Sequence, residues 1–510
     1  MSYQTITQKL LLTFSLQGLT FLAHGEVLPP KAELLSKEVS GEQKHWFQGS
    51  VSEAFAAAAK QQKHIILYWG AEWCPPCNDL KDQVFSHPEF PPFASRFVMV
   101  YLDGDSEGAQ TWGEKLKVSG YPTVVLFDPK GKELFRFSSG MDFPEFKQAI
   151  GSAMASGKNF KTIISNLKGD KPKLSLEDWQ TLSTTYIDQD ALGLDDKTTE
   201  KLVEKSWRLC PSEFPVGKAI FAAALWDSSL QEKSTLKETF KANENAILDL
   251  ILSSGYTMDA ARNSLMTEPQ KKVESLKPEN KERVRQRLVT YVKDLATSPA
   301  RPPSERAVVL HSYLDLESMG QAPNSPNLRK ETQWILDSIL QATTTSHQMA
   351  STYPEIASIL EQLSGPKDAV LFLESKIPGA KTPWYFESML SSLENTLGNK
   401  VKALEWSEKA KLTSKGSATK LQWISKDVAL KAKILEKSDA KITATISEFF
   451  AEAKNQSDKF DGRNGSAHKR VAAVIKDLGE SGGEARKSSL AFCQKDKKCL
   501  SIYSVSQSKR

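Results

Sequence analysis

The chain of 510 residues is 40% hydrophobic and 25% charged, an ordinary composition for a soluble globular protein. Its length exceeds what one hydrophobic core normally organises, so we expect two or more domains. The net charge is only +5, and no basic stripe interleaved with aromatic residues stands out, so a nucleic-acid-binding function is not expected.

Residues 1–25 have the three regions of a secretory signal peptide. Lys9 precedes an apolar run over residues 10–22, and Ala23-His24-Gly25 places small residues where a signal peptidase reads. Polar residues interrupt the run, which is too short to form a stable membrane span. A buried amino-terminal helix is the alternative. The pattern predicts a cleaved signal peptide, a periplasmic or otherwise exported protein, and a polar lead-in at residues 26–46.

Residues 47–154 are predicted to form one α/β domain. Ser50 and Glu53 have the spacing of a capping box before an alanine-rich helix at residues 54–62. Short apolar runs predict strands, and apolar residues at helical spacing predict helices. In chain order these are a strand at 64–69, a helix at 78–85, a strand at 97–102, a helix at 111–117, strands at 124–127 and 133–137, and a helix at 142–154.

Two cysteines lie in the stretch Trp73-Cys74-Pro75-Pro76-Cys77, between the first strand and the helix that follows it. The helix amino terminus presents unpaired N–H groups and a partial positive charge to Cys74, which favours its thiolate. We therefore predict Cys74 as the attacking thiol and Cys77 as the resolving thiol of a redox-active disulfide. Proline suits a first helical turn, where the N–H that it lacks would have no partner.

A structural disulfide or half of a zinc site is the alternative for this pair. A zinc site needs four ligands, and no second closely spaced Cys or His pair lies nearby. Cys493 and Cys499 lie at the far end of the chain, with five residues between them. We expect redox chemistry, with no metal and with no cofactor beyond the Cys74–Cys77 disulfide itself.

The WCxxC stretch and Gly120-Tyr121-Pro122-Thr123 together resemble the thioredoxin family, over about residues 40–154. The resemblance implies a thioredoxin-like fold that exchanges disulfides through Cys74 and Cys77. It also implies that Pro122 is cis and faces the dithiol, which leaves the Tyr121 backbone free to pair with a substrate peptide. The supporting site residues are then Trp73, Pro75, Pro76, Tyr121 and Pro122.

Within that family, the chain is similar to the periplasmic carboxy-terminal domain of the membrane thiol:disulfide interchange protein and its soluble relatives. Three segments carry this likeness: Ala71–Cys74, Val84–Glu89 and Tyr101–Asp105. The Pro75-Pro76 dipeptide looks more like the cytochrome-maturation and ResA-type reductases. Many thioredoxins carry a buried aspartate where this chain has Tyr68, so we expect a different proton path, through Glu72 or water.

Residues 174–480 are predicted to be all-helical, after a linker at residues 155–173. Period-two strand patterns disappear there, and apolar residues recur at helical spacing. Within residues 365–453, Asp368–Glu374 and Lys402–Glu408 are related by a shift of thirty-four residues, the tetratricopeptide period. An irregular helical bundle with a chance match is the alternative. Stacked helix pairs of either kind commonly provide a groove for peptides or proteins.

The remaining cysteines lie in the carboxy-terminal part of the chain. Residues 481–510 are rich in Gly, Ser and Lys and are predicted to be a polar tail that is mobile in parts. We favour a local Cys493–Cys499 disulfide over a second redox pair. Cys210 is predicted to be a buried thiol. No two histidines have catalytic or metal-ligand spacing, so we expect ordinary surface or core residues.

Two classes of function fit the sequence. The first is an exported thiol–disulfide oxidoreductase that reduces or exchanges disulfides in client proteins, takes electrons from a donor thiol protein and docks clients on its helical region. The second is a helical interaction scaffold whose thioredoxin-like domain has a minor catalytic role. The intact Cys-Pro-Pro-Cys motif favours the first class, because a mere platform needs neither cysteine.

Overall fold

The computed structural model describes residues 45–504, except residues 119, 139, 171, 186–193, 321, 323 and 324. The predicted signal peptide and most of the predicted lead-in lie outside the described residues. Trp46, at the end of that lead-in, already belongs to the folded domain, because its ring is buried against Phe85 and Tyr101.

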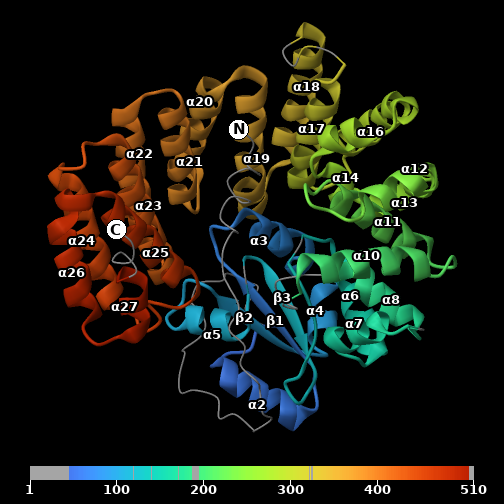
Figure 1. Ribbon diagram of the computed structural model, residues 1–510, viewed down its shortest axis with the longest axis horizontal. Helices are drawn as coiled ribbons and strands as arrows, with labels where there is room; N and C mark the ends of the chain where they lie inside the picture. Colours follow the sequence, from blue (N-terminus) through green and yellow to red (C-terminus); the bar gives the residue numbers. More distant parts are fainter. Residues whose placement is uncertain are drawn as a thin grey trace. The chain divides into compact units, whose positions relative to one another are not determined.

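A four-stranded sheet organises the amino-terminal domain (Figure 1). The strands are β1 (Ile65–Gly70), β2 (Val98–Asp103), β3 (Thr123–Phe127) and β4 (Glu133–Phe137), and their order across the sheet is β2-β1-β3-β4. β1 and β2 are parallel, whereas β3 runs antiparallel to both β1 and β4. β1 is buried along its whole length, as expected for a strand in a sheet that is covered on both faces.

Helices cover both faces of the sheet because the side chains of each strand alternate between the faces. One core contains Ile65 and Trp69 of β1, and the other contains Ile66 and Tyr68. The first core includes residues of α2 (Val51–Gln61) and α5 (Ala109–Lys115); the second includes residues of α3 (Pro75–Leu80), α4 (Phe90–Ala94) and α6 (Phe143–Ser156).

The predicted elements of this domain are present, with ends that differ by a few residues, and the Ser50–Glu53 capping box starts α2. Two features were not predicted: the short helix α4, and a π-helical turn at Lys81–Phe85 that continues α3. The thioredoxin-like arrangement expected from the resemblance is confirmed.

The predicted linker at residues 155–173 is wrong over most of its length. Helix α7 (Phe160–Lys168) occupies its middle, and the buried side chains of that helix belong to the core of the helical region. They are Phe160, Ile163, Ile164 and Leu167. This spacing places all four on one helical face, so their burial makes α7 part of the folded helical region.

The helical region extends from α7 to the end of the described chain, and no strand is described beyond β4. Several of its helices begin with proline at the first helical position, which explains the regular breaks in the sequence. The helices are α8 (Leu176–Thr185), α10 (Asp196–Leu209), α11 (Pro215–Ser229), α12 (Lys237–Leu252), α13 (Gly255–Ala260), α14 (Arg262–Met266), α15 (Pro269–Ser275), α16 (Pro278–Thr297), α17 (Pro303–Glu317), α18 (Pro326–Ala342), α19 (Ser346–Ser364), α20 (Pro366–Lys376), α21 (Pro383–Thr396), α22 (Lys400–Thr413), α23 (Ser417–Ile434), α24 (Ala440–Lys454), α25 (Gly462–Asp477), α26 (Gly483–Cys493) and α27 (Lys497–Tyr503).

Helices α20 to α23 bear on the predicted repeat. α20 and α22 begin at Pro366 and Lys400, and α21 and α23 begin at Pro383 and Ser417. Both pairs of starts have the same offset as the two matching sequence segments. A tetratricopeptide assignment of these helices stays a prediction.

The predicted polar tail is wrong up to residue 504. Helices α26 and α27 fold back onto α24 and α25, and Cys499 and Tyr503 are buried in their shared core. Cys493 and Cys499 form the expected disulfide, which joins α26 to α27. The lysines of this segment and most of its serines are exposed, so its average composition concealed a buried stripe. Cys210 is free and buried, and burial raises the pKa of its thiol to about 12.

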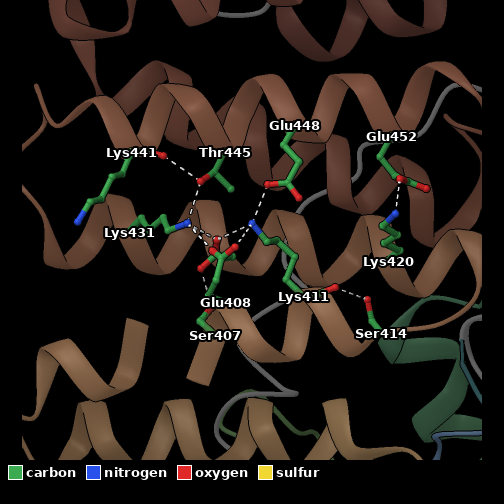
Figure 2. A network of polar contacts seen from close by, with 11 residues as sticks. Ser407, Glu408, Lys411, Ser414, Lys420, Lys431, Lys441, Thr445, Glu448 and Glu452 are labelled. Atoms are coloured by element: carbon green, nitrogen blue, oxygen red, sulfur yellow. Dashed lines mark hydrogen bonds and ion pairs between the residues drawn. The ribbon is translucent and has the colours of Figure 1, made fainter. Parts of the chain in front are cut away.

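A partly buried network of charges joins α22, α23 and α24 (Figure 2). The Lys431 ammonium lies 2.6 Å from Asp427 and 3.0 Å from Glu408, and the Lys411 ammonium lies 2.7 Å from both Glu408 and Glu448. Asp427, which has no exposed surface, also accepts a hydrogen bond of 2.8 Å from Ser407. Groups this well paired hold three helices in one arrangement, because losing one partner would leave a charge buried without compensation.

Candidate functional site

The dithiol lies where β1 passes into α3. Cys74 is the N-cap residue of α3, and its sulfur accepts a 3.3 Å hydrogen bond from the backbone N–H of Cys77. Pro75 and Pro76 occupy the first helical turn, as predicted. Cys74 and Cys77 form a disulfide. Cys74 is 3% exposed and Cys77 is 0% exposed, whereas Pro76 is exposed.

The loop before β3 lies beside Trp73. The Tyr121–Pro122 peptide bond is cis, as the resemblance implied, whereas the expectation that Pro122 faces the dithiol stays a prediction. The Tyr121 ring stacks on Trp69 and meets Trp73 edge-on, with centroids 5.6 Å and 6.0 Å away. The Tyr121 hydroxyl accepts a hydrogen bond of 3.1 Å from Gln110. Trp73, Tyr121 and the dithiol are therefore parts of one site.

The helical region covers the Trp73 side of this site. The Trp73 ring stacks with Tyr385 of α21 at 6.1 Å between centroids and lies 6.0 Å from Trp423 of α23. The Arg463 guanidinium of α25 lies over the rings of Trp73 and Tyr121, at 4.7 Å and 5.0 Å. No local sequence pattern indicated these partners, because they follow the dithiol by about three hundred to four hundred residues.

Asp105 connects Trp73 to the start of α23. Its carboxylate accepts hydrogen bonds from the Trp73 indole at 2.9 Å and the Thr419 hydroxyl at 2.6 Å, and its backbone oxygen accepts one from the Ser417 N–H. Gly416 permits this approach: its φ is +85°, and a Cβ there would lie 2.5 Å from the Asp105 Cβ. Burial raises the pKa of Asp105, and the charge of Arg463 counteracts that rise.

The active-site helix α3 is held on another side by α19. His347 shares a 2.7 Å hydrogen bond with Asn78, whose amide donates to the Cys74 carbonyl at 3.0 Å. Thr345 and Gln348 donate to Asp82, at 3.2 Å and 3.1 Å. His347, expected to be an ordinary residue, thus contacts the helix that carries both cysteines.

Two carboxyl groups of the site have strongly raised pKa values. Burial raises the pKa of Asp79 to about 7, although it accepts hydrogen bonds from Ser304 and Ser351. Burial, with repulsion from Asp105, raises the pKa of Asp103 to about 7. Asp103 is paired with Gly70 across the β1–β2 ladder and is close enough to Lys81 and Glu72 for their charges to shift it.

Position 68, which carries an aspartate in many thioredoxins, is aromatic in this core. The Tyr68 ring stacks on Tyr101 of β2 at 5.0 Å. Glu72 or water was the predicted proton path in place of that aspartate. Asp103, a titratable group of the site, was not predicted. The acidic pair that follows the predicted strand at 97–102 was the available signal.

The part of the chain that the structure describes has no candidate metal site and no candidate membrane span. Within it, no group of three His, Cys, Asp or Glu residues is arranged to hold a metal ion. None of its helices combines the length and the apolar character that crossing a bilayer requires.

Comparison with known proteins places the amino-terminal domain. Residues 46–129 match a family model described as thioredoxin-like. The thiol:disulfide interchange protein DsbD of Pectobacterium atrosepticum is 31% identical over 87 residues, which are 17% of this chain and 15% of that protein. The disulfide bond reductase DsbH of Chlamydia pneumoniae is 31% identical over 98 residues, which are 17% of this chain and 59% of that protein.

Among solved structures, a DsbH oxidoreductase is 24% identical, with a TM-score of 0.21; the match covers 24% of this chain and 95% of that one. The chain thus spans 15% of the length of the DsbD relative and 59% of the DsbH relative. The likeness is one of domains rather than of whole proteins.

Proposed function

We propose that this chain, with its thioredoxin-like domain, is an exported thiol–disulfide oxidoreductase that reduces or exchanges disulfides in client proteins. The observation that carries the proposal is the position of Cys74, at the N-cap of α3 with Cys77 one turn further on. The N–H groups and partial positive charge of a helix amino terminus stabilise a thiolate there. The names of the DsbD and DsbH relatives, an interchange protein and a reductase, support the same chemistry.

The exchange proceeds in two steps that use both cysteines. The Cys74 thiolate attacks one sulfur of a client disulfide and forms a mixed disulfide with it, while the other client sulfur leaves as a thiolate and takes a proton from water. Cys77 then loses its proton and attacks the Cys74 sulfur, so the Cys74–Cys77 disulfide forms and the second client thiolate leaves and is protonated. The client gains two electrons and two protons, and a donor thiol protein restores the dithiol by the reverse steps.

The helical region is proposed to select the clients. Cys74 is only 3% exposed, and α21, α23 and α25 contribute side chains that contact Trp73 beside it. A client disulfide therefore has to approach along surfaces that the helical region forms. The Tyr121 backbone is the expected partner for the client peptide.

Export rests on three supports. Residues 1–25 have the pattern of a signal peptide. The Cys493–Cys499 disulfide lies outside the dithiol site, and a structural disulfide of this kind suits an oxidising compartment. The reductase and interchange relatives act on disulfides by name.

The decisive experiment traps the mixed disulfide between Cys74 and a client protein. Cys77→Ala should leave a client attached to Cys74, because no thiol remains to resolve the mixed disulfide. We expect the full-length variant to accumulate disulfide-linked client proteins that a reductant releases and mass spectrometry assigns to Cys74. The matched control is Cys74→Ala, which should trap nothing at this site. A Cys77→Ala variant that captures nothing, while Cys74→Ala still exchanges disulfides, would refute the proposal.

The low exposure of the dithiol also favours a second candidate, a helical interaction scaffold. In that case the partner binds without any disulfide. A variant with Cys74 and Cys77 both replaced by serine would then retain its partners in full, whereas an oxidoreductase would lose them.

A further inference from the structure

Three basic side chains of α23 and α25 lie close enough together for their charges to affect one another. Lys426 of α23 places its ammonium 3.4 Å from the centroid of the Trp423 ring, and that ring lies 6.0 Å from Trp73. Arg463 of α25 covers Trp73 itself. Arg470, two turns further along α25, donates hydrogen bonds to Ser425 and Gln422, which are both neutral. We call Lys426, Arg463 and Arg470 the basic cluster.

The acids nearest to this cluster are already engaged. Asp427, the residue after Lys426, is bonded to Lys431 and Ser407 in the partly buried network described above. Asp105 attracts Arg463 but also accepts hydrogen bonds from Trp73 and Thr419. Among the described residues, Lys426 and Arg470 form no ion pair, and one terminal nitrogen of Arg463 is buried without a hydrogen-bond partner.

The surroundings of Lys426 disfavour its charge. Its side chain is exposed to water, yet desolvation by the surrounding protein lowers its pKa well below the ordinary value, and Arg470 and Arg463 lower it further. Arg470 is affected in the same way, since burial and the charge of Arg463 lower its pKa. Three cations this close to one another are stabilised by an added anion.

We propose that the basic cluster binds a carboxylate of the disulfide substrate, next to the dithiol. The inference rests on the proposed function, because that function makes the ligand at this place a substrate of Cys74, and carboxylates are the usual anions of peptides and of small biological thiols. Binding would hold the substrate disulfide near Trp73 before the Cys74 thiolate attacks it. The carboxylate takes no part in the exchange, whose bonds and electrons are those given above.

Small disulfides of similar size and different charge test the proposal with the full-length protein. Dithiodipropionate is anionic, hydroxyethyl disulfide is neutral and cystamine is cationic. The rate at which each oxidises the reduced Cys74–Cys77 pair is measured and expressed relative to hydroxyethyl disulfide, so that differences in the amount of folded protein cancel. We expect Lys426→Gln to reduce the relative rate for dithiodipropionate by roughly tenfold, and Lys426→Glu to reduce it further and to raise that for cystamine.

The matched control is Lys433→Glu, which reverses an exposed charge in the last turn of the same helix, away from Trp73. It makes the same change in net charge as Lys426→Glu and should leave all three relative rates unchanged. Equal effects of the two substitutions, or no effect of either, would overturn the proposal. If no disulfide oxidises the dithiol, even the neutral one, the proposed function fails instead.

A second arm identifies the source of the carboxylate. Two disulfide-bonded peptides differ only in having glutamates or glutamines beside the cystine. If Lys426→Glu slows only the glutamate peptide, the site accepts an acidic protein segment. If it slows dithiodipropionate but neither peptide, the substrate is a small anionic disulfide.

Discussion

The contact between Trp423 and Trp73 governs how well the helical region covers the dithiol. Trp423 is buried, and its ring reaches Trp73 across the boundary between the two regions. Replacing Trp423 with alanine removes that ring. We expect the reduced Cys74 thiol to react faster with an alkylating reagent in the variant, because the cover then opens more often.

Trp423→Ala has two separate effects, one on the free energy of unfolding and one on how often the cover opens. Losing a buried tryptophan from a core costs about 3–5 kcal/mol of unfolding free energy. Only the pairing of the two rings acts on the cover, however, and an aromatic pair contributes about 0.5–1.5 kcal/mol beyond its buried area. Since about 1.4 kcal/mol is a factor of ten in an equilibrium constant, opening should increase roughly two- to tenfold.

The assay follows Cys74 alkylation by mass spectrometry in the reduced protein and measures unfolding free energy with urea in parallel. Trp226→Ala is the matched control, because Trp226 is buried in a core cluster of the helical region that includes neither Trp73 nor its contact Tyr385. That variant should lose stability without exposing Cys74. Equal alkylation rates in the wild type and Trp423→Ala would refute the idea that this contact covers the dithiol.

Two further substitutions test the contacts around the site. Gly416→Ala should lose at least about 1 kcal/mol more unfolding free energy, measured with urea, than Gly365→Ala. Both glycines have positive φ, but of the two only Gly416 faces another residue, since a Cβ there would lie 2.5 Å from the Asp105 Cβ. Equal losses would contradict the close approach. Asp79→Asn tests the raised pKa. The folded state keeps the Asp79 proton up to about pH 7, whereas the unfolded chain releases it near pH 3.8. The unfolding free energy of the wild type should therefore decrease as the pH rises from about 3.8 to about 7. Above pH 7 the asparagine variant should be more stable by about 2 kcal/mol, allowing for the partial exposure of Asp79, and an unchanged pH profile would contradict this account.

Local patterns in the sequence were sufficient for the thioredoxin-like domain. The apolar run of β1, the capping box at Ser50 and the WCxxC stretch each depend on neighbours within a few residues, and the structure has all three. The helix α7 was missed although Phe160 to Leu167 has helical spacing, because the Gly- and Lys-rich segment after it was taken to define the whole stretch.

The other half of the site could not be predicted in this way. Tyr385, Trp423 and Arg463 come from three different helices, and each sits there because of how those helices pack. Helical periodicity tells which residues face a core, but it does not tell which distant residue they will meet.

The long separation between the two halves of the site also has a consequence during synthesis. The domain that carries Cys74 is complete once α6 has been made, whereas Arg463 of α25 follows about three hundred residues later. At about 5–20 residues per second, roughly 15–60 s pass between the two events. A growing chain therefore exposes its cysteines for that time without the side chains that later cover them. The same dithiol is accessible first in an open domain and is covered later.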